Sequence, residues 1–142
     1  MPITERGMKL VQKGDGEMTL ADFIKYLVTL LNLKKIDMPY EDERSWHELF
    51  FFLKTQREDM PDFIRSLIFD WDTSYPKSSE VSEYLHALHW TACVTAQNPS
   101  YEKITLSPQM SSFWQKEYDN LDAYDKNYLT IVVPIAERFM NN

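Results

Sequence analysis

The chain has 142 residues, of which 44% are hydrophobic and 14% aromatic, so it has the length of one domain and enough apolar side chains to close a core. Its 15 Lys and Arg residues are outnumbered by 22 Asp and Glu, and the formal net charge of −7 opposes general attraction to nucleic-acid phosphates or anionic lipid. The single cysteine, Cys93, excludes an internal disulfide and a Cys-rich zinc module, and it is consistent with a reducing compartment.

The first clear element is a helix predicted over residues 19–34. Thr19 and Asp22 have the spacing of a capping box, in which each side chain bonds the other residue's backbone N–H. Apolar residues then recur at helical spacing and predict one buried face: Leu20, Phe23, Ile24, Leu27, Val28 and Leu31.

A second helix is predicted after Pro39. The acidic run 41–43 suits its first turn because carboxylates favour the positive end of the helix dipole, and an apolar stripe follows at Trp46, Leu49, Phe50 and Leu53. Phe51 and Phe52 broaden that stripe, so the Phe50–Phe52 region is either core, which we favour, or a surface shared with a partner.

The next elements are a short third helix and a fourth. Asp59 and Pro61 read as the cap and early proline of the third helix, whose apolar residues are Phe63, Ile64, Leu67 and Ile68. A loop over 71–76 then leads to a helix capped by Ser78 or Ser79, which we expect to end near Trp90 and to bury Val81, Leu85 and Leu88.

After this helix, the sequence pattern changes from one typical of helices to one typical of strands. The stretches 93–95 and 103–106 have strand-like composition and flank the turn-rich residues 97–100, which predicts a β-hairpin. Ser107 and Pro108 next read as the cap and first residue of another helix. A last helix over 125–140 is interrupted by Pro134, which should kink or restart it.

This order of elements predicts a mainly α fold with a small β-hairpin. Helices followed by a two-stranded hairpin are the order of a winged-helix module, so we expect one domain over 1–142 with a winged-helix-like core at about 43–107. Extra N- and C-terminal helices over 19–34 and 108–140 flank this core.

The segment 75–88 and the following Cys93-Val94 resemble a pattern of the Panacea antitoxin domain and related uncharacterised bacterial proteins. In that pattern an aromatic-Gly-Pro turn and a serine precede a leucine-periodic helix and a hydrophobic strand, and an apolar helix stands where this chain has residues 46–53. The chain departs from it because Tyr75 directly precedes Pro76 and no glycine stands near Ala92. The resemblance implies a protein-binding regulator, such as an antitoxin or adaptor, with no chemistry of its own.

Patterns that could carry chemistry are few. His86, His89 and Cys93 have a spacing that zinc can use on one continuous helix, but a closed structural site needs four ligands and the helix is expected to end before Cys93. Asp70 and Asp72 could form an acid/base pair, although clustered loop carboxylates are usually solvated surface. Cys93 with a nearby histidine could act as a nucleophile, but a lone cysteine at the start of a strand is commonly a small hydrophobe. We therefore predict no catalytic, cofactor-binding or metal-binding residues.

The sequence favours a non-enzymatic interaction protein of antitoxin, adaptor or inhibitor type, acting in the cytoplasm, outside membranes, on another protein. The candidate partner-facing or groove-facing residues are Lys77, Ser79, Ser82, Glu83, His86, Asn98 and Lys103. The alternative is a winged-helix DNA-binding transcriptional regulator that uses the same surface. Charge disfavours DNA, because the stretch 70–110 has five acidic and two basic residues.

Overall fold

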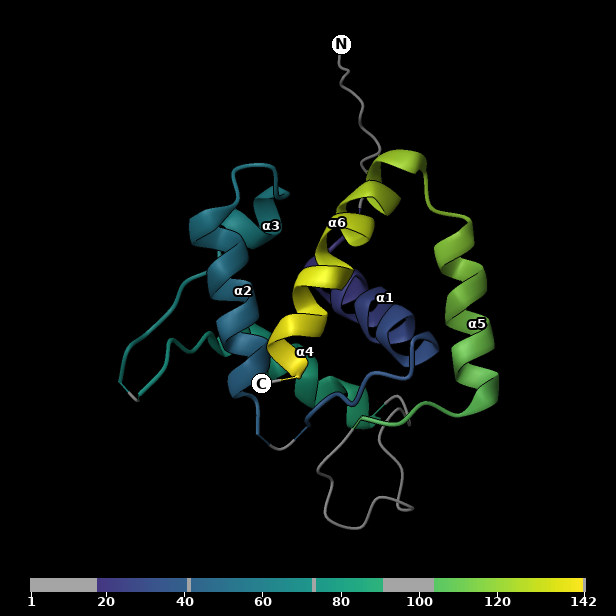
Figure 1. Ribbon diagram of the computed structural model, residues 1–142, viewed down its shortest axis with the longest axis horizontal. Coiled ribbons are helices and arrows are strands. Elements are labelled where there is room, and N and C mark those ends of the chain that lie inside the picture. The colour runs from purple at the N-terminus through teal and green to yellow at the C-terminus, as the bar shows by residue number, and fades with distance from the viewer. Residues whose placement is uncertain (1–17, 41, 73, 91–103, 142) are drawn as a thin grey trace.

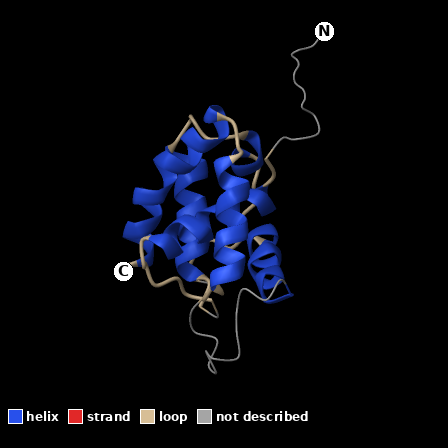
Figure 2. Cartoon of the chain, turned by 90° about the vertical axis from the view of Figure 1, so that its right-hand side faces the viewer, coloured by secondary structure: helices blue, strands red, loops and turns tan. Residues whose placement is uncertain are grey.

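The computed structural model describes residues 18–40, 42–72, 74–90 and 104–141, and these form six helices (Figure 1). The helices are α1 (Leu20–Leu33), α2 (Arg44–Gln56), α3 (Asp62–Arg65), α4 (Ser79–Trp90), α5 (Pro108–Asp119) and α6 (Ala123–Met140). No strand occurs among these residues (Figure 2). The prediction of a mainly helical protein is confirmed.

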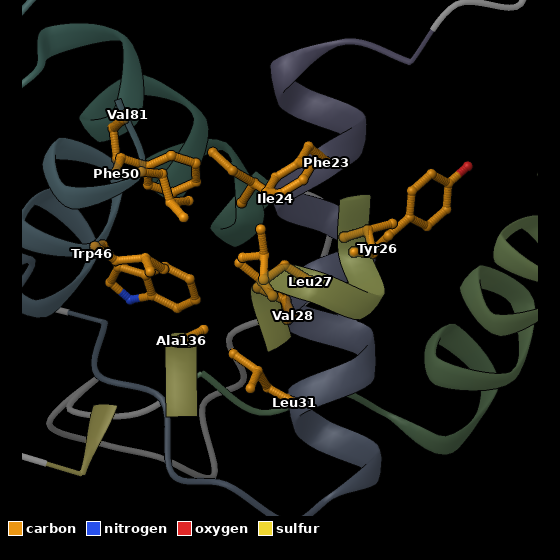
Figure 3. Packing of buried hydrophobic residues seen from close by; sticks show 14 of the residues in the cluster. Phe23, Ile24, Tyr26, Leu27, Val28, Leu31, Trp46, Phe50, Val81 and Ala136 are labelled. Carbon is orange, nitrogen blue, oxygen red and sulfur yellow. The ribbon is translucent and has the colours of Figure 1, made fainter. Parts of the chain in front are cut away.

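Helix α1 is the element around which the others gather. The predicted capping box is present, since the Thr19 hydroxyl accepts from the backbone N–H of Asp22 and the Asp22 carboxylate accepts from that of Thr19, both at 3.2 Å. One face of α1 points toward Trp46 and Phe50 of α2, while Tyr26 points away from them (Figure 3). The Tyr26 ring instead lies 6.1 Å from that of Tyr118 on α5. Both sides of α1 are thus used in packing.

The remaining contacts close the bundle. Helix α1 packs against α4, α5 and α6, and α2 packs against α3 and α6. The buried side chains form one continuous cluster, in which the largest fully buried members include Trp46, Phe23, Phe50, Ile24, Leu27, Leu31, Met38, Leu49 and Leu53. Burial of this apolar surface is the main force that holds the helices together.

The start of α2 differs from the prediction. The acidic residues do not enter the first turn: Glu43 occupies the N-cap position, and the Asp42 carboxylate accepts from the Arg44 backbone N–H at 3.1 Å. Glu43 makes no capping bond, and its side chain is buried and bonded to His47 instead. The position of the Glu43 side chain is therefore determined by its buried hydrogen-bond partners and not by the helix dipole.

The start of α3 also differs from the prediction. Pro61 is its N-cap, while Asp59 pairs with Arg57 at 2.7 Å and caps nothing. The helix has only four residues, so Leu67 and Ile68 follow it; Leu67 is buried and Ile68 is 73% exposed.

The hairpin and the winged-helix core stay predictions. Residues 93–95 and the turn 97–100 lie outside the described residues, as does Lys103. Residues 104–106 are described and form no strand, although the Ile104 N–H donates to the Met38 carbonyl at 2.8 Å. The β-bridge that is present joins Asp70 and Lys77 through two N–H···O bonds of 2.9 Å and closes the predicted loop before α4.

The two C-terminal helices follow the sequence signals closely. The Ser107 hydroxyl accepts from the Met110 backbone N–H at 3.1 Å, and Pro108 is the first residue of α5, as predicted. Helix α6 begins at Ala123, capped by Asp122, and continues through Pro134. Of the two outcomes predicted for Pro134, a kink or a restart, the restart is wrong, because the helix is continuous.

The phenylalanine run divides between core and partly buried positions. Phe50 is fully buried, whereas Phe51 packs edge-on against Phe69 and Trp71, and Phe52 lies 5.6 Å from Phe139 of α6. Core packing therefore accounts for much of the apolar surplus in α2. None of the helices described is both long enough and apolar enough to span a membrane.

Candidate functional site

A pocket of about 450 Å³ lies between the exposed face of α4 and the loop that precedes it. Its lining residues are Asp70, Asp72, Lys77, Ser79, Ser82, Glu83 and His86. Five of these, from Lys77 to His86, are candidate residues of the sequence analysis, so the structure brings them together. The other two candidates, Asn98 and Lys103, lie outside the described residues.

Local structure explains how these side chains meet. The bridge between Asp70 and Lys77 folds the loop back on itself and leads the chain directly into α4. Ser78 starts this helix: its buried hydroxyl accepts from the Val81 backbone N–H at 3.3 Å. Val81 and Leu85 are fully buried, and this fixes the rotation of α4. Residues 79, 82, 83 and 86 then share the opposite face, because helix positions three and four apart are neighbours.

A buried carboxylate supports this face of α4 from behind. Glu43 is only 8% exposed. Its Oε1 accepts a short hydrogen bond from the Ser82 hydroxyl and lies 3.0 Å from His47 Nε2. Its Oε2 lies 2.7 Å from His86 Nε2. One side chain at the start of α2 therefore holds two residues of the pocket wall.

His47 completes the link between α2 and α4. The ring is fully buried, and its Nδ1 accepts a hydrogen bond of 3.0 Å from the Ser78 backbone N–H. Because a neutral imidazole has one acceptor and one donor nitrogen, this bond assigns the proton to Nε2, which donates to Glu43. His47 thereby ties the start of α4 to α2 while satisfying both of its nitrogens.

Serine, histidine and glutamate here do not have the arrangement of a nucleophilic triad. In a triad the carboxylate and the serine occupy different ring nitrogens, and the nitrogen facing the serine has a free lone pair. In this site Ser82 Oγ lies 3.3 Å from His47 Nε2, the same nitrogen that contacts Glu43, and the lone pair of Nδ1 is used by the main chain. The cluster anchors Ser82, whose hydroxyl donates to the Glu43 carboxylate.

The network also changes the acidity of Glu43. Burial alone raises the pKa of this carboxyl, because the charged form loses water. The hydrogen bonds from His47 and Ser82, together with the nearby His86 and His47, outweigh that effect and bring the pKa below its usual value of 4.5. Glu43 is therefore held as a carboxylate at neutral pH.

The outer wall of the pocket has an excess of negative charge. The carboxylates of Asp70, Asp72 and Glu83 face a single lysine, Lys77, and none of the three makes an ion pair or side-chain hydrogen bond within the described part of the chain. No group of three metal-ligating side chains occurs there either. The predicted set of His86, His89 and Cys93 cannot be assembled within it, because Cys93 lies outside.

Sequence reasoning missed the residues behind the pocket. The sequence predicts Glu43 near a helix first turn and gives His47 no role, while Asp70 and Asp72 enter as a possible acid/base pair and as part of the acidic excess over 70–110. A signal was present, since Glu43 and His47, like Ser82 and His86, are four residues apart and so can lie on one helix face. Nothing in the sequence indicates that the two pairs face each other.

Comparison with known proteins gives no relative for this chain: no family model matches it, and neither does any curated protein or solved structure. The resemblance to the Panacea antitoxin domain therefore stays a prediction from the residues that suggested it.

Proposed function

We propose that this chain is a non-enzymatic interaction protein, of antitoxin, adaptor or inhibitor type, which binds another protein at the pocket beside α4. The observation that carries the proposal is the pocket itself: it is open to a ligand, and the buried Glu43 and His47 hold its wall in place. Such a preformed site binds with less ordering cost than a mobile one.

Exposed apolar side chains on the segment that supplies Asp70 and Asp72 support a protein partner. Ile68 is 73% exposed and Trp71 is 61% exposed, and both belong to the segment that supplies Asp70 and Asp72. Trp71 is braced by an edge-on contact with Phe51 of α2, 5.6 Å between ring centroids. A large, exposed aromatic side chain is a common energetic anchor in protein interfaces.

The finer assignments belong to the same proposal. A winged-helix-like core over 43–107 would make α4 the helix that faces a partner, and the single cysteine is consistent with a cytoplasmic location. The DNA-binding alternative would place Glu80 and Glu83 of this helix against phosphate, which costs electrostatic energy. We therefore propose a protein as the partner and treat DNA as an outcome of the test.

The test is site-specific photo-crosslinking in the cells that naturally produce the protein. A benzophenone amino acid replaces Ser79, which lines the pocket, and in a control protein it replaces Phe113, which is 57% exposed on α5. We expect a discrete protein adduct that survives nuclease from the Ser79 position and none from the Phe113 position. Equal labelling from both positions, a nucleic-acid adduct, or no adduct would contradict the proposal.

A further inference from the structure

We infer that the occupant of the pocket beside α4 is an arginine-bearing segment of the partner protein. This inference rests on the proposed function and deepens it by giving the chemistry of the partner. It starts from charge: three carboxylates, those of Asp70, Asp72 and Glu83, line a concave surface that has one lysine.

The carboxylates are available to a ligand. Within the residues described, they have neither an ion pair nor a side-chain hydrogen bond. Some other acidic side chains have partners, as Asp59 has in Arg57 and Glu117 has in Lys25 at 3.0 Å. Three like charges around one hollow repel each other, and a cation placed among them relieves that repulsion.

His86 does not neutralise this charge. Its Nε2 lies 2.7 Å from Glu43 Oε2, so any positive charge on the ring is matched by the buried carboxylate behind the pocket wall. Lys77 is the remaining cation in the lining, and its backbone is fixed by the bridge to Asp70. The open side of the pocket therefore keeps a negative excess whether or not His86 is protonated.

The carboxylates of the pocket lining favour arginine over lysine. A volume of about 450 Å³ lies within the usual range for side-chain and small-molecule sites, roughly 300–1,000 Å³. Arginine has a long apolar stem and a planar, weakly hydrated head that bonds two carboxylate oxygens at once.

The inference is tested by fluorescence anisotropy with the full chain and short fluorescein-labelled peptides. The probes are a peptide of alternating arginine and alanine, its lysine counterpart and its glutamate counterpart, all at about 0.15 M salt. We expect the arginine peptide to bind most tightly, the lysine peptide more weakly and the glutamate peptide not at all.

Two triple variants separate the pocket from the overall negative charge. The pocket variant is Asp70→Asn, Asp72→Asn, Glu83→Gln, and the control variant is Glu58→Gln, Glu80→Gln, Asp119→Asn, which removes the same charge from exposed positions outside the pocket lining. We expect the pocket variant to weaken arginine-peptide binding about ten-fold, and the control variant to weaken it less than about two-fold. Near-native circular dichroism of both variants checks that they fold.

Equal losses in the two variants would overturn the inference, because binding would then follow net charge alone. Failure of the wild-type protein to prefer the arginine peptide over the glutamate peptide would also overturn it. If a protein adduct still forms at Ser79 in the crosslinking experiment, the interaction function stands and only the chemistry of the partner is wrong. If that adduct is absent as well, both proposals fall.

Discussion

The buried carboxylate of Glu43 shows how one residue can hold two helices together. Glu43 contacts His47 of α2, and it contacts Ser82 and His86 of α4. Because Glu43 and His47 are buried, water screens these interactions less than it screens a surface ion pair. Buried polar networks of this kind specify one packing arrangement, since any shift leaves polar groups without partners.

Replacing Glu43 by glutamine should therefore destabilise the protein. We expect Glu43→Gln to lower the free energy of unfolding by about 1–2 kcal/mol near pH 7, because a neutral amide accepts weaker hydrogen bonds than a carboxylate. Urea denaturation measures this difference. The matched control is Glu48→Gln, which removes a half-exposed ion pair with Arg44 on the same helix and should cost less than about 0.5 kcal/mol.

The loss of stability in Glu43→Gln should depend on pH. The folded-state pKa of Glu43 lies below its usual value of 4.5, so its charge stabilises the fold above that pH, and the stabilisation is lost as the pH falls through the lower, folded-state pKa. The difference in unfolding free energy between wild type and Glu43→Gln should therefore shrink as the pH falls below about 4.5. A difference that stays constant down to about pH 3 would show that Glu43 acts through packing alone.

At the level of the helices, Pro134 is an unusual feature because it lies inside α6 and is exposed to solvent. A proline in a helix interior cannot donate to the preceding turn and crowds its carbonyl. We expect Pro134→Ala to raise the free energy of unfolding by about 1–2 kcal/mol, measured by urea denaturation, after allowing for the greater freedom of alanine in the unfolded chain.

The control for Pro134 is Asn127→Ala, seven residues earlier on the same exposed face of α6. This substitution changes helix propensity only, so it should raise the free energy of unfolding by no more than about 0.7 kcal/mol. An equal gain from both variants would mean that α6 already absorbs the proline without strain.

The elements that could be predicted are those with local signals. The capping box at Thr19 and the Ser107–Pro108 start of α5 are both present, because caps depend on residues only three positions apart. The position of Glu43 could not be predicted, since its partners on α4 are 39 and 43 residues further along the chain, at Ser82 and His86. Likewise, the pocket depends on a bridge between Asp70 and Lys77 that no local motif announces.

For the molecule as a whole, charge decides between the two classes of partner. The net charge of −7 and the three carboxylates around the pocket favour a cationic protein segment and oppose a phosphate backbone. The same surface cannot serve both, because the carboxylates that attract arginine repel phosphate.

The wild-type protein should therefore show no binding to a random-sequence DNA duplex, even at about 50 mM salt, where phosphate contacts are strongest. An electrophoretic mobility shift with increasing protein concentration measures this. A DNA-binding regulator would instead shift the duplex and lose affinity steeply with added salt. Its affinity for DNA would weaken further in Lys77→Ala or Lys103→Ala, each of which removes one cation from the predicted groove-facing surface.

In the proposed interaction protein, Lys77→Ala should instead tighten binding of the arginine peptide, because it removes a cation that competes with the peptide for the carboxylates of the pocket.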